Sequence, residues 1–238
     1  MFQKLVPLNS VQHANKKIKA LEGYQFASQA HVASLMIHEF TRAAPIYPIV
    51  FLDDGKGGYF PYAMLGLDLG ENLFVEPSGR WQATYIPAVV RRYPFALAQG
   101  NQPDQLTVCI DEGSVLVNDS EGDPIFTADG EPTPILDNAK RYLSELQQME
   151  VQTYAFCRFL VEQDLLTPLQ MRVSQNSQAK NITGCHMISE EKLNKLSNEQ
   201  FIQLRAKGFL PAVYAHLLSL GQAERLVALK DSQASRAA

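Results

Sequence analysis

The sequence predicts an α+β fold made mainly of antiparallel sheets and hairpins, backed by a long helix and followed by a helical C-terminal part. Three observations predict this fold. Short apolar segments separated by turn residues indicate strands that pair in hairpins. A helical apolar period runs from residue 133 to about residue 162. Helix start and stop signals then recur after residue 197.

The composition favours one folded domain. Hydrophobic residues make up 46% of the 238 residues, which is enough for a buried core. Neither a repeat nor a composition break divides the chain, so we predict a single α+β domain over residues 1–230 and a disordered tail over residues 231–238. The net charge of -4 lacks the positive balance that neutralises phosphates, which argues against general nucleic-acid binding.

The sequence also indicates a location. The longest near-apolar stretch, residues 209–220, is too short for a membrane span of ~20 residues. The first residues show no apolar run followed by a cleavage site, so we expect no secretory signal. Three scattered cysteines without CxxC spacing favour a reducing compartment, namely Cys109, Cys157 and Cys185. We therefore predict a cytoplasmic protein without a membrane span.

The first elements are two short strands, a helix and a hairpin. Residues 4–8 and 16–21 predict the strands, and an apolar stripe over residues 30–44 predicts the helix, which Pro45 ends. Residues 48–52 and 59–67 then predict a hairpin around a glycine-rich turn. The members of the stripe are Val32, Leu35, Met36, Phe40 and Ala43.

The middle of the chain predicts further short elements. Residues 72–75 predict a strand, and residues 87–92 predict one or two helical turns between Pro87 and Pro94. Alternating residues over 106–110 and 115–117 predict a second hairpin, with a polar turn between its arms.

Thr133 and Pro134 predict the start of the long helix, with Thr133 as its N-cap. At about 1.5 Å per residue, a helix ending near Glu162 is roughly 42 Å long and should back the sheet. The remaining elements are strands at 169–173 and 181–188 joined by a polar loop, a helix from the capping box Ser197–Gln200 to Gly208, and a last helix over 209–220.

Glu39 lies in the middle of the apolar stripe, where a carboxylate needs a partner. An arginine is best shaped to meet it, and the candidates are Arg80, Arg91 and Arg92. Two interpretations stay open: a structural ion pair that fixes the helix against residues 80–95, or a general acid/base or metal ligand.

Known catalytic motifs are missing. His38 and Glu39 suggest a zinc helix, but Arg42 stands where that motif needs its second histidine. No nucleophile elbow and no phosphate loop is present, and the five histidines show no ligand spacing. We therefore predict neither a metal nor a cofactor, and the sequence does not decide whether the chain is an enzyme.

Residues 80–95 combine arginines with aromatic residues, which dominate binding hot spots. This arginine–aromatic face predicts binding of a peptide or an acidic ligand, although its aromatic residues are equally suited to anchor a core. The candidate binding residues are Glu39, Arg80, Trp81, Tyr85, Arg91, Arg92 and Tyr93.

Several specific motifs support a family resemblance. They are Leu8-Asn9, Glu39-Phe40, Tyr47-Pro48-Ile49-Val50-Phe51, Glu71-Asn72-Leu73-Phe74, Gly79-Arg80-Trp81, Tyr85-Ile86-Pro87 and Arg91-Arg92-Tyr93-Pro94-Phe95. Together with residues 125–126, 129–132 and 215–219, they resemble the SapC family over nearly the whole chain. That family takes its name from a bacterial surface-layer gene cluster, and its members are associated with genes resembling flavin-dependent tryptophan halogenases and cupin-like hydroxylases.

The resemblance implies an accessory or peptide-modifying role. Our first hypothesis is a non-enzymatic binding protein of a bacterial surface-layer or peptide-modification system, which holds a protein or peptide partner with its arginine–aromatic face. A halogenase-like protein or a cupin-like hydroxylase would be such a partner. The alternative is a metal-dependent, oxygenase-like, peptide-modifying enzyme that uses Glu39 and histidines. A structural oligomer is the third hypothesis.

Overall fold

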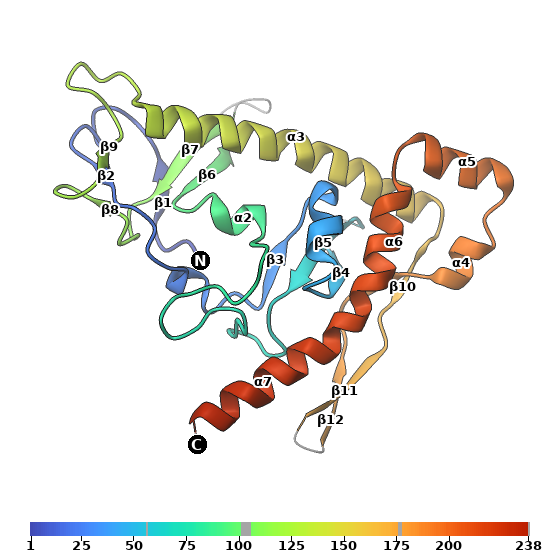
Figure 1. Ribbon diagram of the computed structural model, residues 1–238. Coiled ribbons are helices and arrows are strands. Elements are labelled where there is room, and N and C mark those ends of the chain that lie inside the picture. Colours follow the sequence, from blue (N-terminus) through green and yellow to red (C-terminus); the bar gives the residue numbers. More distant parts are fainter. Residues whose placement is uncertain (56, 101–105, 176–177, 238) are drawn as a thin grey trace.

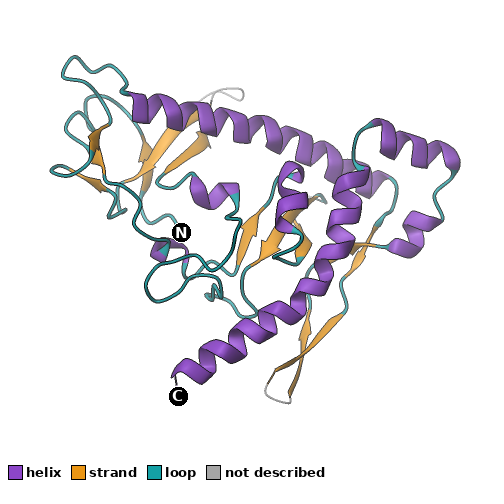
Figure 2. Ribbon diagram, viewed as in Figure 1, coloured by secondary structure: helices purple, strands orange, loops and turns teal. Residues whose placement is uncertain are grey.

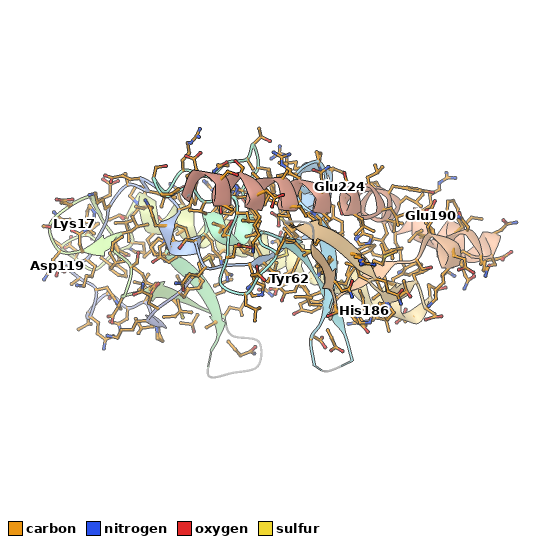
Figure 3. All side chains as sticks on the ribbon, turned by 90° about the horizontal axis from the view of Figure 1, so that it is seen from below. Lys17, Tyr62, Asp119, His186, Glu190 and Glu224 are labelled. Carbon is orange, nitrogen blue, oxygen red and sulfur yellow. The ribbon has the colours of Figure 1, made fainter. Side chains whose placement is uncertain are left out.

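The computed structural model describes residues 1–55, 57–100, 106–175 and 178–237 of the chain. Antiparallel sheets lie beneath the long helix α3 (Pro134–Glu162), and further helices cover the C-terminal side (Figures 1 and 2). The molecule is elongated, with Lys17 and Asp119 at one end and Glu190 at the other (Figure 3). The predicted α+β fold is confirmed.

Two larger sheets form the body of the described structure, and their strand pairs are antiparallel. The first has the order β1-β7-β6 and the second has the order β10-β13-β4-β5-β3. The strands of the first sheet are β1 (Leu5–Pro7), β6 (Phe95–Gln99) and β7 (Leu106–Asp111). Those of the second are β3 (Val32–Ser34), β4 (Ile49–Asp53), β5 (Tyr59–Met64), β10 (Leu166–Pro168) and β13 (His186–Ile188).

Smaller strand groups lie beside these sheets. The strand β2 pairs with both β8 and β9, and β11 pairs with β12 in a hairpin. Their bounds are β2 (Lys17–Ile18), β8 (Val117–Asn118), β9 (Asp123–Pro124), β11 (Met171–Gln175) and β12 (Gln178–Ile182).

The helix α3 connects two hydrophobic clusters. Its N-terminal half contributes Leu136 and Leu143 to a smaller cluster, which includes Phe95 and Ile110 of the first sheet. Its C-terminal half contributes Phe156 to a larger cluster around the second sheet. Because close-packed interiors resist deformation, one helix that packs in both clusters fixes the sheets relative to each other.

Many predicted elements are confirmed. The strands at 4–8 and 16–21 correspond to β1 and β2, and the hairpin at 48–52 and 59–67 corresponds to β4 and β5. The turns at 87–92 form α2 (Ala88–Arg91). Residue 56 of the predicted turn and residues 176–177 of the predicted polar loop lie outside the described residues. The C-terminal helices are α4 (Glu190–Asn194), α5 (Asn198–Ala206), α6 (Leu210–Ser219) and α7 (Ala223–Ala237).

The helix predicted over residues 30–44 is wrong. The structure instead contains β3, the short helix η2 (Ile37–Glu39) and α1 (Phe40–Ala43). β3 pairs with β5 at the edge of the second sheet, and this pairing overrides the local helical period. Leu35 and the other apolar residues of the stripe are still buried, apart from Val32, which is half-buried.

The second predicted hairpin is also wrong, because β7 pairs with β1 and β6 whereas Val117 pairs within β8 with β2. The strand predicted at 72–75 is reduced to a single bridge between Val75 and Trp81. The strand predicted at 181–188 is split between β12 and β13, with Gly184 at a φ of 82 between them.

Thr133 is the N-cap residue of α3, as predicted, but its hydroxyl donates to the carbonyls of Pro124 and Ile125 at 2.6 and 3.1 Å and caps no backbone N–H of the helix. The C-terminal end differs from its prediction. Residues 231–237, predicted to be disordered, continue α7, where Gln233 donates to the carbonyl of Leu73 at 3.1 Å. Residue 238 lies outside the described residues. None of the helices in the described ranges is long and apolar enough to cross a membrane.

Candidate functional site

Glu39 is buried at the end of η2, with 4% of its surface exposed. Its Oε2 accepts from the backbone N–H of Met36 at 2.8 Å. Its Oε1 accepts from the hydroxyl of Tyr85 at 2.6 Å and from the backbone N–H of Ala88 at 2.8 Å. These three donors satisfy the carboxylate in the interior, since charge-assisted hydrogen bonds offset the cost of burying it.

The predicted direct pairing of Glu39 with an arginine is wrong. Within the described ranges, Glu39 forms no ion pair with Arg80, Arg91 or Arg92. The physical reason is local: the turn from Met36 and the first residue of α2 already place backbone donors against the carboxylate.

Arg91 is linked to this carboxylate indirectly: it contacts the ring of Tyr85, whose hydroxyl donates to Glu39. Its guanidinium carbon is 5.7 Å from the centroid of the Tyr85 ring and 5.6 Å from that of Tyr142, and its Nε donates to the carbonyl of Ile86 at 3.1 Å. Burial raises the pKa of Tyr85, Glu39 raises it further, and Arg91 opposes both. The Tyr85 hydroxyl therefore stays protonated and donates to Glu39.

Tyr142 is fixed as well, because its hydroxyl donates to the carbonyl of Ala88 at 3.1 Å. Arg91 itself is exposed. We name Tyr85, Arg91 and Tyr142 the Arg91 platform: an exposed guanidinium held against two tyrosine rings, each of which is anchored through its hydroxyl.

Trp81 and Tyr93 belong to the interior. Trp81 is buried, and its Nε1 donates to the hydroxyl of Tyr47 at 2.9 Å, which in turn donates to the carbonyl of Tyr85. Tyr93 is also buried, and its ring stacks on Phe26 with centroids 3.9 Å apart. These two residues of the predicted face therefore anchor the core.

Arg80 is separate from the Arg91 platform. Its side chain is 74% exposed and pairs with Glu76, where Nε lies 2.8 Å from Oε2. The structure thus brings together Glu39, Tyr85 and Arg91 from the predicted set, and it places Arg80 in a surface ion pair.

Arg92 is half-buried and lies apart from the Arg91 platform. It lines a cavity of about 350 Å³ beneath α3, and its guanidinium carbon lies 5.6 Å from the ring centroid of Phe2. Burial lowers the pKa of Arg92, and the charge of Glu150 in the same cavity opposes this shift. Burial raises the pKa of Glu150, and the positive charge of Arg92 opposes this rise.

Glu150 was not among the site residues predicted from the sequence. Its signal was present, because Glu150 stands four residues after Leu146 and seven after Leu143, on the buried side of α3. Like Glu39, Glu150 is a carboxylate within an apolar stripe, where burial requires a partner.

Other reactive side chains are engaged in the core. Burial raises the pKa of the Cys157 thiol to about 12, which keeps it protonated. Burial lowers the pKa of His216 to about 3, and its Nε2 accepts from the backbone N–H of Ile188 at 3.0 Å. Among the described residues, no group of three or more histidines, cysteines or acidic residues is arranged to hold a metal ion.

The fold and the site define an α+β protein in which a buried carboxylate anchors an arginine platform. The family model described as SapC matches residues 8–226. Because this match covers nearly the whole chain, the protein belongs to the SapC family. No curated protein and no solved structure gives a significant match.

Proposed function

We propose that the chain is a non-enzymatic binding or accessory protein of a bacterial surface-layer or peptide-modification system, and that it holds its partner with the Arg91 platform. One observation carries this proposal: the exposed guanidinium of Arg91 lies against two tyrosine rings, within 5.7 Å of each centroid. Arginine and tyrosine are the residue types that most often dominate binding energy.

The platform is built to bind without reorganisation. The hydroxyl of Tyr85 is held by Glu39, that of Tyr142 by the carbonyl of Ala88, and Nε of Arg91 by the carbonyl of Ile86. An arginine held in this way loses less conformational freedom when it meets a carboxylate. An acidic side chain or the C-terminus of a protein or peptide partner therefore suits the platform best.

This proposal assigns Glu39 a positioning role. Its carboxylate oxygens accept from three O–H and N–H donors, so no observation in the described residues favours the alternative in which Glu39 binds a metal. The family resemblance suggests a halogenase-like protein or a cupin-like hydroxylase as the partner. We also propose a cytoplasmic location, which the three free cysteines support.

The test is the binding of a halogenase-like and a cupin-like protein from the same organism, measured by titration calorimetry. We expect Arg91→Ala to weaken binding of one of them by at least about tenfold, because removing a hot-spot arginine typically costs more than ~1.4 kcal/mol. Arg80→Ala is the matched control, since Arg80 is an exposed arginine outside the platform. It should bind as the wild type does.

Melting temperatures separate binding from folding. Both variants should melt close to the wild type, because both side chains are exposed. The proposal is overturned if Arg91→Ala binds as tightly as Arg80→Ala, or if the wild type binds neither class of partner.

A further inference from the structure

A cavity of about 350 Å³ lies beneath α3. It is formed where β3 of the second sheet, the β6–β7 hairpin of the first sheet, α2 and α3 meet. In the view from below, the β6–β7 and β4–β5 hairpins project from the same side of the molecule (Figure 3). At the rim of the cavity, Gln99 and Leu106 are exposed, so solvent reaches it.

Two opposite charges line this cavity without contacting each other. Arg92 follows α2 and Glu150 belongs to α3, and both are half-buried. In the described part of the chain, no ion pair within 4.0 Å joins them. The Nε atom of Arg92 is buried and has no hydrogen-bond partner among the described residues. A buried donor of this kind normally has a partner, so this N–H group is an unmet hydrogen-bond donor beside the cavity.

The rest of the wall suits a small amphipathic molecule. Buried side chains of Val89, Leu143 and Leu146 form an apolar surface, and half-buried Ser34 and Gln147 add polar groups beside the charges. The volume lies within the range of about 300–1,000 Å³ that is typical of small-molecule sites. Such a wall offers an apolar surface together with two charged groups.

We infer that this cavity binds a free α-amino acid with an apolar side chain. The ligand carboxylate pairs with the guanidinium of Arg92, which is shaped for bidentate contact, and the ligand ammonium pairs with Glu150. The side chain of the ligand packs on the leucines of α3. A ligand with both charges neutralises Arg92 and Glu150 together, whereas a simple anion or cation leaves one charge without a partner. This inference does not depend on the Arg91 platform.

The burial of Glu150 supports this assignment. Its pKa is raised chiefly by burial, so a ligand ammonium that stabilises its charged form would gain from the contact. Arg92, in the same lining, supplies the positive charge that a ligand carboxylate needs.

The first experiment compares three ligands on the full-length wild-type protein by titration calorimetry. L-phenylalanine carries both charges, N-acetyl-L-phenylalanine keeps only the carboxylate, as a peptide C-terminus does, and L-phenylalaninamide keeps only the ammonium, as a peptide N-terminus does. We expect L-phenylalanine to bind, and both analogues to bind at least about tenfold more weakly, since hydrogen bonds to charged groups are worth that much. Equal binding of either analogue, or no binding of L-phenylalanine at millimolar concentration, overturns the inference.

The second experiment assigns the charges to residues. Glu150→Gln should weaken the binding of L-phenylalanine by at least about tenfold. The binding of N-acetyl-L-phenylalanine should be unchanged, because only the ligand ammonium loses its partner in this variant. Glu145→Gln is the matched control, an exposed carboxylate on the same helix outside the cavity, and it should bind all three ligands as the wild type does. Unchanged binding of L-phenylalanine to Glu150→Gln contradicts the assignment.

Discussion

Glu39 ties three segments of the backbone together through its two carboxylate oxygens. Oε2 closes the turn that begins at Met36, while Oε1 receives the hydroxyl of Tyr85 and the first backbone N–H of α2, from Ala88. Since the donors come from different segments, the carboxylate fixes how η2 meets the residues that precede and form α2. It also sets the orientation of the tyrosine that carries Arg91.

We predict that Glu39→Gln lowers the free energy of unfolding by about 2–4 kcal/mol, because the amide has only one acceptor oxygen. Whichever way the amide turns, its NH₂ group faces a donor that Glu39 now satisfies. Urea unfolding followed by circular dichroism measures the change.

Glu191→Gln is the control for this substitution, because Glu191 is an exposed carboxylate paired with Lys195. It should cost less than about 1 kcal/mol, as surface ion pairs do. Equal losses for the two variants would show that the buried hydrogen bonds of Glu39 contribute no more than a surface pair.

At this scale the sequence located the important residues better than their partners. The position of Glu39 within an apolar stripe correctly predicted its burial, although that stripe is not one helix. Its partners were missed because two of them are backbone N–H groups, which every non-proline residue carries and which no residue pattern marks. Tyr85 was a predicted site residue, but its hydrogen bond to Glu39 depends on how two distant segments meet.

Among the elements, α6 is attached to the second sheet by buried polar contacts, and one of them comes from His216. Nε2 of His216 accepts from the N–H of Ile188 in β13, and its ring lies 5.0 Å from that of Phe51 in β4. The acceptor role requires neutral imidazole, which agrees with the lowering of its pKa from the ordinary 6.5 to about 3 by burial.

We predict a matching loss of stability in acid. Between pH 6.5 and about 3 the unfolded chain binds a proton at His216 that the folded chain does not, so stability is full above pH 6.5 and falls as the pH drops. On lowering the pH from 7 to 4.5, this group should cost about 2–3 kcal/mol.

The measurement is the difference between the wild type and His216→Gln in urea unfolding at both pH values. Other titrating groups cancel in this difference, and the amide oxygen of Gln can still accept from Ile188. The wild type should lose more stability than the variant on acidification. Equal losses would show that His216 is protonated in the folded protein over this range.

Sequence patterns predicted long elements more reliably than short ones. α3 was found because its apolar period is sustained and Pro134 marks its start, so local signals alone define it. In contrast, β3 and β7 take their places by pairing with β5 and with β1 and β6. Which strands pair depends on contacts distant in sequence, and these leave no local period to read.

Over the whole molecule, α3 contributes to both hydrophobic clusters, which favours one cooperative unit. The single domain over residues 1–230 therefore remains our prediction. Thermal unfolding should follow one transition, with the fluorescence of Trp81 in the larger cluster coinciding with far-ultraviolet circular dichroism.

The substitution Leu136→Ala tests whether the two hydrophobic clusters unfold together. Leu136 is 1% exposed and belongs to the smaller cluster, so truncating it should destabilise the protein by about 2–4 kcal/mol. If the chain is one unit, the transition of Trp81 shifts as far as that of the circular dichroism signal. A shift in circular dichroism without one in fluorescence would indicate two separate units.

The cavity could not be predicted from the sequence. Its lining comes from residues 34 to 150, on both sheets and two helices, so no single segment contains its pattern. The family and the fold class were predictable because they rest on motifs and periods within short windows. The cavity depends on the way α3 spans the gap between sheets, which only the packed structure defines.

The pairing of early strands with late ones has a consequence for synthesis on the ribosome. β1 waits for β7, since residue 5 pairs with residue 111, and the free edge of β4 in the β4–β5 hairpin waits for β13, since residue 51 pairs with residue 186. At roughly 5–20 residues per second, the nascent chain exposes these strand edges for several seconds before their partners emerge. The N-terminal half is therefore the part of this protein that most needs protection from aggregation while translation continues.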